Sequence, residues 1–241
     1  MVSRALKAGF EALVLTVDCP VLGQRQRDLH NGFTVPLRPS LRLLWDVCRC
    51  PRWTAHIARY GVPKMQNLID GEHTNASMAS LASLMTRNLD ASANWRDVDM
   101  LRALWPKKLV IKGVLSPEDA VLAVERGFDA IAVSNHGGRQ LDFAPSSISV
   151  LAEVAAAVAG RAELYLDGGV RRGSDIAKAV ALGARAVLLG RATLFGVAAN
   201  GEQGVHEALA ILGNELDRCL ALIGCRSVAE LNARYVRVAR T

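Results

Sequence analysis

The sequence has little that would place it in a bilayer or direct it to secretion. No run of about 18 uninterrupted apolar residues occurs, although 51% of the 241 residues are hydrophobic. The N-terminus lacks the charged and then apolar pattern of a secretory signal. We therefore expect a globular, cytoplasmic protein that does not span a membrane and is long enough to bury one sizeable core.

Cysteine is also sparse and irregularly placed. The five cysteines are an odd number, and their spacings match no common zinc pattern. Cys48 and Cys50 stand two positions apart without a second such pair. We expect all five to be reduced and structural, and we expect no metal site.

The net charge of +6 is concentrated in one region instead of being spread over the chain. Between Arg25 and Lys64 there are eight basic and two acidic residues, a difference that equals the whole excess. This pattern indicates a local basic surface and not a basic domain. Aromatic residues in the region have apolar neighbours and no nucleic-acid-binding motif accompanies them, which argues against a nucleic-acid partner.

Three stretches of the sequence align without gaps and repeat one pattern. Each is typical of a helix end, a glycine in the left-handed position that closes a helix, and a short apolar strand. Ser116-Pro117 and Gly173-Ser174 supply plausible starts for two of the helices. The three stretches are residues 5–16, 123–134 and 179–190.

Two further apolar runs, residues 109–112 and 163–166, bring the strand candidates to about five, alternating with helices. This alternation predicts a parallel α/β fold, whose continuous apolar strands are buried on both faces. Polar residues at every strand end favour a TIM (β/α)8 barrel over a doubly wound sheet. Because a barrel needs eight strands, we expect an incomplete barrel with about strands 4–8, forming a single domain over residues 1–241.

The repeat also predicts where the functional side chains would lie. Thr16, Ser134 and Gly190 occupy the same place in the three stretches, so the residues after them should share one rim of the barrel. Asp18 and His136 then stand at equivalent strand ends. A carboxylate beside a histidine can orient the imidazole for acid–base work, although either residue alone could equally be structural.

Cations accompany this pair. Arg25 and Arg139 follow the same two strand ends, and guanidinium groups suit a carboxylate-bearing substrate. Lys112 ends a strand that otherwise reads as buried, so it is either one half of a rim salt bridge or a cation used by the site. Glycine-rich turns at residues 167–174 and 190–191 precede helices and carry arginines, which suits a phosphate group.

In this order, these motifs resemble the FMN-dependent 2-hydroxy-acid oxidase and dehydrogenase family over nearly the whole chain. Further segments are similar to the mandelate-oxidising branch of that family: 27–31, 50–53, 90–95, 104–106 and 190–195. The motifs that carry the family resemblance are Thr-Val-Asp-Cys-Pro-Val-Leu-Gly-Gln-Arg (16–25), Ile-Lys-Gly (111–113), Ser-Asn-His-Gly-Gly-Arg-Gln-Leu-Asp (134–142) and Asp-Gly-Gly-Val-Arg-Arg-Gly (167–173).

The resemblance implies oxidation of an L-2-hydroxy acid, mandelate-like or lactate-like, to the 2-oxo acid with FMN as cofactor. It implies that His136 is the base, that Asp18 holds its imidazole, and that Arg25 and Arg139 bind the substrate carboxylate. Lys112 would stabilise negative charge on the flavin. The remaining flavin contacts that it implies are Thr16, Ser134, Asp167, Gly168, Gly169, Arg171, Gly190 and Arg191.

Residues 30–75 form a basic amphipathic insertion after the first strand, too long for an ordinary connection. By composition it is either a lid over the barrel or a segment lying at an anionic membrane surface. The resemblance favours a membrane surface through residues 30–70, on the inner face of the cytoplasmic membrane, with a respiratory electron acceptor and a homotetrameric assembly. The alternative is a truncated, non-catalytic barrel that needs its first strands or another chain.

Overall fold

The computed structural model describes residues 1–21, 23, 26–32, 40–61 and 89–237. The chain divides into two compact units, the first comprising residue 1 and residues 20–92, the second residues 2–19 and 93–241. The strands expected from the sequence all lie in the second unit. The single domain expected over residues 1–241 stays a prediction.

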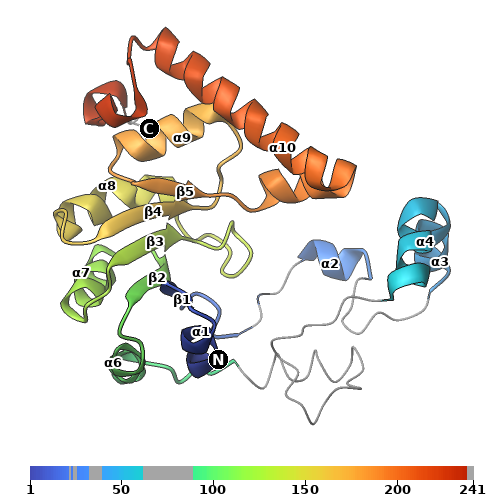
Figure 1. Cartoon of the computed structure of the whole chain (residues 1–241), viewed down its shortest axis with the longest axis horizontal. Helices are drawn as coiled ribbons and strands as arrows, with labels where there is room; N and C mark the ends of the chain where they lie inside the picture. Colours follow the sequence, from blue (N-terminus) through green and yellow to red (C-terminus); the bar gives the residue numbers. More distant parts are fainter. Residues whose placement is uncertain (22, 24–25, 33–39, 62–88, 238–241) are drawn as a thin grey trace. The chain divides into compact units, whose positions relative to one another are not determined.

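The second unit is built on a parallel sheet of five strands in the order β1-β2-β3-β4-β5 (Figure 1). Each strand pairs with the next one along the chain, as consecutive strands of a barrel do. This confirms the parallel α/β fold. In the described part of the chain β1 and β5 are not neighbours, so these five strands form an open sheet. The strands are β1 Ala12–Thr16, β2 Lys108–Val114, β3 Ala130–Ser134, β4 Glu163–Asp167 and β5 Ala186–Leu188.

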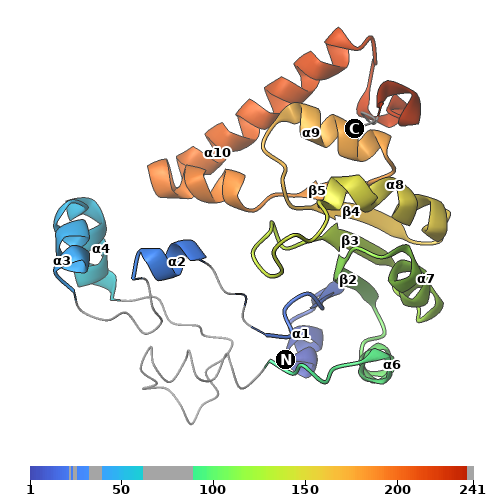
Figure 2. The ribbon, with the colours of Figure 1, turned by 180° about the vertical axis from the view of Figure 1, so that it is seen from behind.

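Helices connect the strands, and α7 and α8 lie beside one another along one side of the sheet (Figures 1 and 2). Backbone angles at Asn200 and Gly201 interrupt α10, which is otherwise the longest helix of this unit. The elements are α1 Val2–Lys7, α6 Trp95–Leu104, α7 Pro117–Glu125, α8 Ser147–Val158, α9 Gly173–Ala181, α10 Arg191–Leu222, and the 3-10 turns η3 Val228–Glu230 and η4 Ala233–Tyr235.

Local sequence signals account for the helix boundaries. Gly9, Gly127 and Gly183 have φ angles of 79°, 76° and 108°, which confirms the left-handed position predicted after each helix. The hydroxyl of Ser116 accepts a hydrogen bond from the Asp119 amide at 3.2 Å, and Pro117 follows at the first position of α7. The three glycines fix where a helix stops before the next strand, and Ser116 fixes where α7 begins.

The core lies mainly between β2, β3 and β4 and the helices α7 and α8, and every residue of β3 is buried. The outer strands differ from the prediction that all strands are buried on both faces. β1 alternates between exposed and half-buried residues, and Val14 is 53% exposed. The apolar pattern therefore identified the strands, but burial also requires a covering layer, and the described residues cover β1 and β5 incompletely.

The first unit contains α2 Gln26–His30, α3 Leu41–Cys48 and α4 Pro51–Tyr60. Ser40 caps α3, and the Thr54 hydroxyl donates a hydrogen bond to the Val47 carbonyl at 2.8 Å, joining α3 to α4. Only residues 30–32 and 40–61 of the expected insertion are described; the rest of 30–75 lies outside. Within the described ranges, no helix combines the length and the apolar character needed to cross a bilayer.

The five cysteines are free. Cys225 is buried, whereas Cys48 and Cys50 are exposed in the first unit. The expectation that all five are structural is therefore wrong for Cys48 and Cys50, because they occur at the ends of short surface helices and pack into no core.

Candidate functional site

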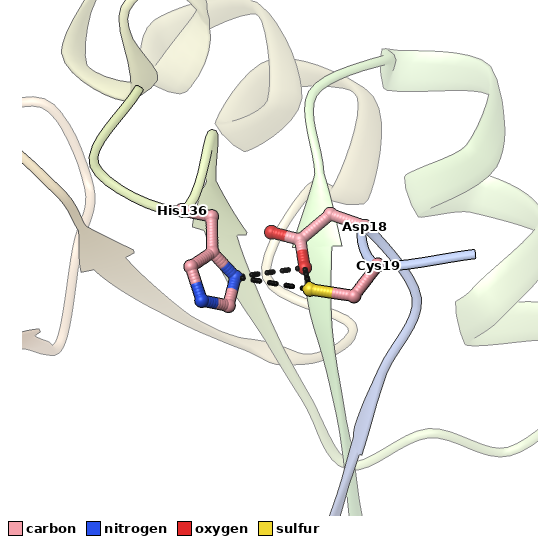
Figure 3. Close-up of side chains that lie close together, drawn as sticks. All are labelled: Asp18, Cys19 and His136. Atoms are coloured by element: carbon pink, nitrogen blue, oxygen red, sulfur yellow. Dashed lines mark hydrogen bonds and ion pairs between the residues drawn. The ribbon is translucent and has the colours of Figure 1, made fainter. Parts of the chain in front are cut away.

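Asp18 and His136 meet at the carboxyl ends of β1 and β3 (Figure 3). Oδ1 of Asp18 lies 3.0 Å from Nδ1 of His136, and the two side chains are 12% and 32% exposed. Because a carboxylate can only accept, this contact places the imidazole proton on Nδ1 and leaves the lone pair on Nε2. The pair is therefore arranged as a base whose cation a neighbouring carboxylate would stabilise.

The loop after β3 holds His136 in an unusual backbone conformation. Its φ angle is 55°, in the left-handed region that residues other than glycine seldom occupy. The His136 amide donates to the Ser134 hydroxyl at 2.9 Å. Asn135 braces the same loop, since its amide donates to the Ser147 hydroxyl and its side chain donates to the Pro145 carbonyl. These contacts aim the imidazole across the strand ends at Asp18.

Gly113 allows Asp18 to approach β2. A Cβ atom at Gly113 would lie 2.7 Å from the Cβ and Cγ atoms of Asp18, and the φ angle of Gly113 is 107°. Both observations require glycine at this position. Gly113 was part of a motif identified in the sequence, but nothing in the sequence indicated this contact.

Cys19 is a third member of the cluster and was not predicted. Its Sγ lies 3.4 Å from His136 Nδ1 and 3.2 Å from Asp18 Oδ1, and it accepts a hydrogen bond from the Gln140 amide nitrogen at 2.8 Å. Burial, together with the hydrogen bond to Asp18, raises the pKa of the Cys19 thiol to about 11. The thiol is therefore protonated at neutral pH. Its position directly after Asp18 was the one signal that could have suggested it.

Lys112, Ser134 and Asp167 form a polar network at the ends of β2, β3 and β4. Lys112 Nζ lies 2.9 Å from Asp167 Oδ2 and donates to Ser134 Oγ at 3.2 Å, while Ser134 donates to Asp167 at 2.6 Å. The side chains of Lys112 and Asp167 are 17% and 16% exposed. Both alternatives for Lys112 thus remain: it has its anionic partner, and its ammonium group stands at the strand ends where the expected cofactor would lie.

The two glycine-rich turns differ in what they offer to an anion. At the start of α9, Asp175 accepts from the amides of Arg171 and Arg172, and Glu215 accepts from the amide of Gly173. At the start of α10, Gly190 makes no side-chain cap. The amide groups of α10, with the exposed Arg191 beside them, therefore fit the phosphate end of a nucleotide better than those of α9.

Nearby glycines leave room for a bound group. Gly168 and Gly169 have φ angles of 97° and 78°, and a Cβ atom at Gly169 or Gly190 would meet nothing within 4 Å. Open space, an uncapped helix start and the Lys112 cation together fit a flavin nucleotide at these strand ends.

The other predicted site residues have fewer described contacts with the site. Arg25 lies outside the described residues. Arg139 is exposed in the loop after His136, and Thr16 is exposed at the end of β1. Arg191 donates to the Gly137 carbonyl at 2.7 Å, which connects the start of α10 to the loop that carries His136. The structure thus joins Asp18 with His136, and Lys112 with Ser134 and Asp167, but shows no hydrogen bond or ion pair from Arg139 to any of these described groups.

Comparison with known proteins agrees with this arrangement. Residues 1–238 match the family model of FMN-dependent dehydrogenases. The chain is 48% identical to (S)-mandelate dehydrogenase of Pseudomonas putida over 98% of its own length and 59% of that protein. It is 42% identical to the L-lactate oxidase of a Nostoc species over 99% of its own length and 60% of the relative.

Solved structures give the same result. A crystal structure described as the monotopic membrane protein (S)-mandelate dehydrogenase superposes with a TM-score of 0.93 at 48% identity, covering 98% of this chain and 62% of the other. A mandelate oxidase superposes with a TM-score of 0.69 at 38% identity, covering 95% of this chain and 55% of the other. The chain spans about three fifths of the length of the curated relatives it matches. The chain belongs to the FMN-dependent dehydrogenase family.

Proposed function

We propose that this chain carries the base and the cofactor-facing cations of an FMN-dependent dehydrogenase that oxidises an L-2-hydroxy acid to the 2-oxo acid. The observation that supports this most directly is the 3.0 Å contact between Asp18 Oδ1 and His136 Nδ1 at adjoining strand ends. It leaves His136 Nε2 as the proton acceptor. Identity to mandelate dehydrogenase favours an aromatic substrate over lactate.

His136 takes one proton from the substrate as the C2–H and O–H bonds are lost and the carbonyl forms. Asp18 stabilises the imidazolium cation that results, because its carboxylate already accepts from Nδ1. FMN, when bound, would accept the electron pair together with the second hydrogen, so that both hydrogens lost from the substrate are accounted for. The orientation by Asp18 costs no reorganisation during the reaction, since the hydrogen bond is present beforehand.

Positively charged side chains would stabilise negative charge on both the flavin and the substrate. Lys112 would stabilise negative charge on FMN when it is bound, and Arg139 and Arg25 would bind the substrate carboxylate. Thr16 would face the ring, and Ser134, which is buried and accepts from Lys112 at 3.2 Å, would stand behind that lysine on the same side of the site. The residues that would hold the ribityl and phosphate end are Asp167, Gly168, Gly169, Arg171, Gly190 and Arg191, and the start of α10 would take the phosphate.

Flavin uptake and reduction test this function. The purified chain is mixed with FMN, gel-filtered and inspected for retained flavin absorbance, then made anaerobic and given L-mandelate, L-lactate or the D enantiomers. We expect retained FMN and bleaching by L-mandelate faster than by L-lactate, with none by the D acids. A chain that retains FMN but is not bleached by any 2-hydroxy acid contradicts the proposal.

A second candidate is a barrel segment that takes up FMN only together with another polypeptide. The open sheet supports it, because β1 and β5 each pair on one side only among the described residues and expose Val14 and Leu188. A colourless chain that gains FMN binding when a polypeptide supplying further strands is added would favour this candidate. Uptake of FMN by the chain alone would rule it out.

Association with an anionic membrane surface is a separate part of the proposal. Leu41, Leu44 and Trp45 lie at helical spacing on α3 and are 87%, 61% and 64% exposed, which suits insertion at a lipid headgroup boundary. The crystallised relative described as monotopic supports the same location for this chain. A respiratory acceptor in that membrane and a homotetramer complete the proposed assembly.

A further inference from the structure

Three different metal-ligating atoms converge in the second unit. Asp18, Cys19 and His136 each offer one donor atom, and these atoms all lie within 4.8 Å of one another. The separations are 3.0 Å from Asp18 Oδ1 to His136 Nδ1, 3.2 Å from Asp18 Oδ1 to Cys19 Sγ, and 3.4 Å from Cys19 Sγ to His136 Nδ1. Figure 3 shows the three side chains pointing toward one another.

This triangle is close to the face of a tetrahedral zinc site. Bond lengths of about 2.0–2.3 Å to oxygen, nitrogen and sulfur place neighbouring ligand atoms roughly 3.3–3.6 Å apart. Each separation in the cluster is within a few tenths of an ångström of that range.

The cluster also contains unused coordinating capacity. Oδ2 of Asp18 is buried and has no hydrogen-bond partner in the part of the chain that the structure describes. A buried carboxylate oxygen without a partner costs free energy unless a cation or donor reaches it. Gln140 meanwhile holds the Cys19 sulfur at the site by donating to it at 2.8 Å.

We propose that Asp18, Cys19 and His136 bind a zinc-type divalent cation, and that the bound metal switches off the base of the proposed dehydrogenase. Three protein ligands of carboxylate, thiolate and imidazole type suit such an ion, with water in the fourth position. The inference rests on the proposed function only for its effect on activity. Metal binding itself depends on the three side chains alone.

The loss of the base follows from the nitrogen that the metal occupies. Nδ1 of His136 now carries the proton directed at Asp18; when the metal takes its lone pair, the imidazole proton moves to Nε2 by exchange with solvent. The thiol releases its proton to solvent as sulfur becomes a ligand. Nε2 then has no lone pair to accept a substrate proton, so the site binds metal or performs proton abstraction, but not both.

Cobalt(II) is the probe for the metal site. The full chain, with FMN where it binds, is titrated with cobalt chloride. The visible bands of tetrahedral cobalt are recorded at wavelengths beyond flavin absorption, and sulfur-to-cobalt charge transfer is read in the near ultraviolet as the difference from the same sample without cobalt. We expect one cobalt per chain, displaced by added zinc. We expect loss of the sulfur bands in Cys19→Ala and Cys19→Ser, and at least about tenfold weaker affinity in His136→Gln.

Cys48 and Cys50 provide the control, because they are exposed in the first unit. A Cys48→Ser/Cys50→Ser variant should keep the bands at full intensity, and circular dichroism should show that the Cys19 variants remain folded. No sulfur bands in the unaltered chain, or bands that persist in Cys19→Ala and disappear in the double variant, would overturn the proposal.

An inhibition assay tests the switch separately from the site. Zinc should abolish anaerobic flavin bleaching in the unaltered chain at concentrations that displace cobalt. In Cys19→Ala the same zinc concentration should inhibit much less, so the ratio of the rate with zinc to the rate without zinc should be at least about tenfold higher than in the unaltered chain. Bleaching that zinc leaves unaffected at saturation contradicts the switch. If no chain is bleached even without zinc, the dehydrogenase function fails while the cobalt bands still decide the metal site.

Discussion

Nδ1 of His136 lies 3.0 Å from Oδ1 of Asp18, a residue 118 positions earlier in the chain. The contact spans the ends of β1 and β3, which β2 separates in the sheet. The Lys112 ammonium group stands on the intervening strand, in contact with Ser134 and Asp167. Three neighbouring strand ends thus contribute a base, its orienting carboxylate and a cation.

The Asp18→Asn variant should lose rate with little loss of stability. The amide keeps the shape of the side chain but removes the negative charge that stabilises the imidazolium cation. A hydrogen bond to a charged group contributes about 1.5–3 kcal/mol, so the rate of flavin bleaching should fall about tenfold to a hundredfold. Asp142→Asn, at an exposed position in the loop after β3, is the matched control. Equal rates for the two variants would contradict the role of Asp18.

The Gly113→Ala variant should displace Asp18. In the left-handed region a Cβ atom costs about 1–2 kcal/mol, and both Gly113 and Gly160 have positive φ angles, 107° and 73°. The added methyl group meets nothing within 4 Å at Gly160 but lies 2.7 Å from Asp18 at Gly113. Chemical denaturation should therefore show the larger loss of stability for Gly113→Ala, and only this variant should slow bleaching. A fully active Gly113→Ala chain would show that the Asp18 position is not constrained.

Asp129 should make stability depend on pH. Burial alone would raise the pKa of the Asp129 carboxyl, but hydrogen bonds from Lys108 at 2.6 Å and the Leu109 amide at 2.9 Å, with the charges of Lys108 and Arg102, hold that pKa below its usual value. A lowered folded-state pKa means that the stabilisation is complete above the unfolded-state pKa and is lost as pH falls through the folded-state pKa.

The variant that tests this is Asp129→Asn. At neutral pH its free energy of unfolding should be lower by about 1.5–3 kcal/mol, the contribution of hydrogen bonds to a charged group. The difference should shrink on acidification below the ordinary carboxyl range. Asp217→Asn, at an exposed position of α10, should change little at any pH. A loss of stability in Asp129→Asn that is the same at acidic and neutral pH would contradict the assignment.

The Leu44→Ser variant should weaken binding to anionic membranes. Leu44 is 61% exposed on α3, and withdrawing a leucine side chain from a lipid boundary costs about 1.5–3 kcal/mol, at least about tenfold in affinity. Sedimentation with vesicles containing anionic lipid measures this. The same substitution at Leu222, which is 82% exposed at the end of α10, is the control. Equal effects of the two substitutions would indicate that α3 has no special part in membrane binding.

Local patterns carried most of the fold prediction. The glycine after each helix and the apolar run that follows it depend on a few neighbouring residues, so the strands were placed within two residues of their observed ends. The repeat also put Asp18 and His136 at corresponding strand ends, and their contact followed from that. The exposure of Val14 could not be predicted in this way, because it depends on what covers β1.

Contacts between distant loops were the part that the sequence did not indicate. The Cys19 sulfur contacts His136, 117 positions away in the sequence, and Glu215 accepts a hydrogen bond from the Gly173 amide, 42 positions away. Neither contact follows from a sequence motif, because each depends on how two loops or helices pack once the sheet has formed. The cysteine spacing likewise predicted no metal site, because the proposed ligands come from the ends of two different strands and not from one short segment.

The most direct test of His136 as the base is the rate of anaerobic flavin bleaching by L-mandelate in the chain with His136→Gln, measured beside the unaltered chain with equal bound FMN. Glutamine keeps hydrogen-bonding capacity near Asp18 but cannot take up a proton at neutral pH. We expect a rate lower by on the order of 10²–10⁴, with FMN retention unchanged. Bleaching at the unaltered rate in His136→Gln would contradict the assignment of His136 as the base.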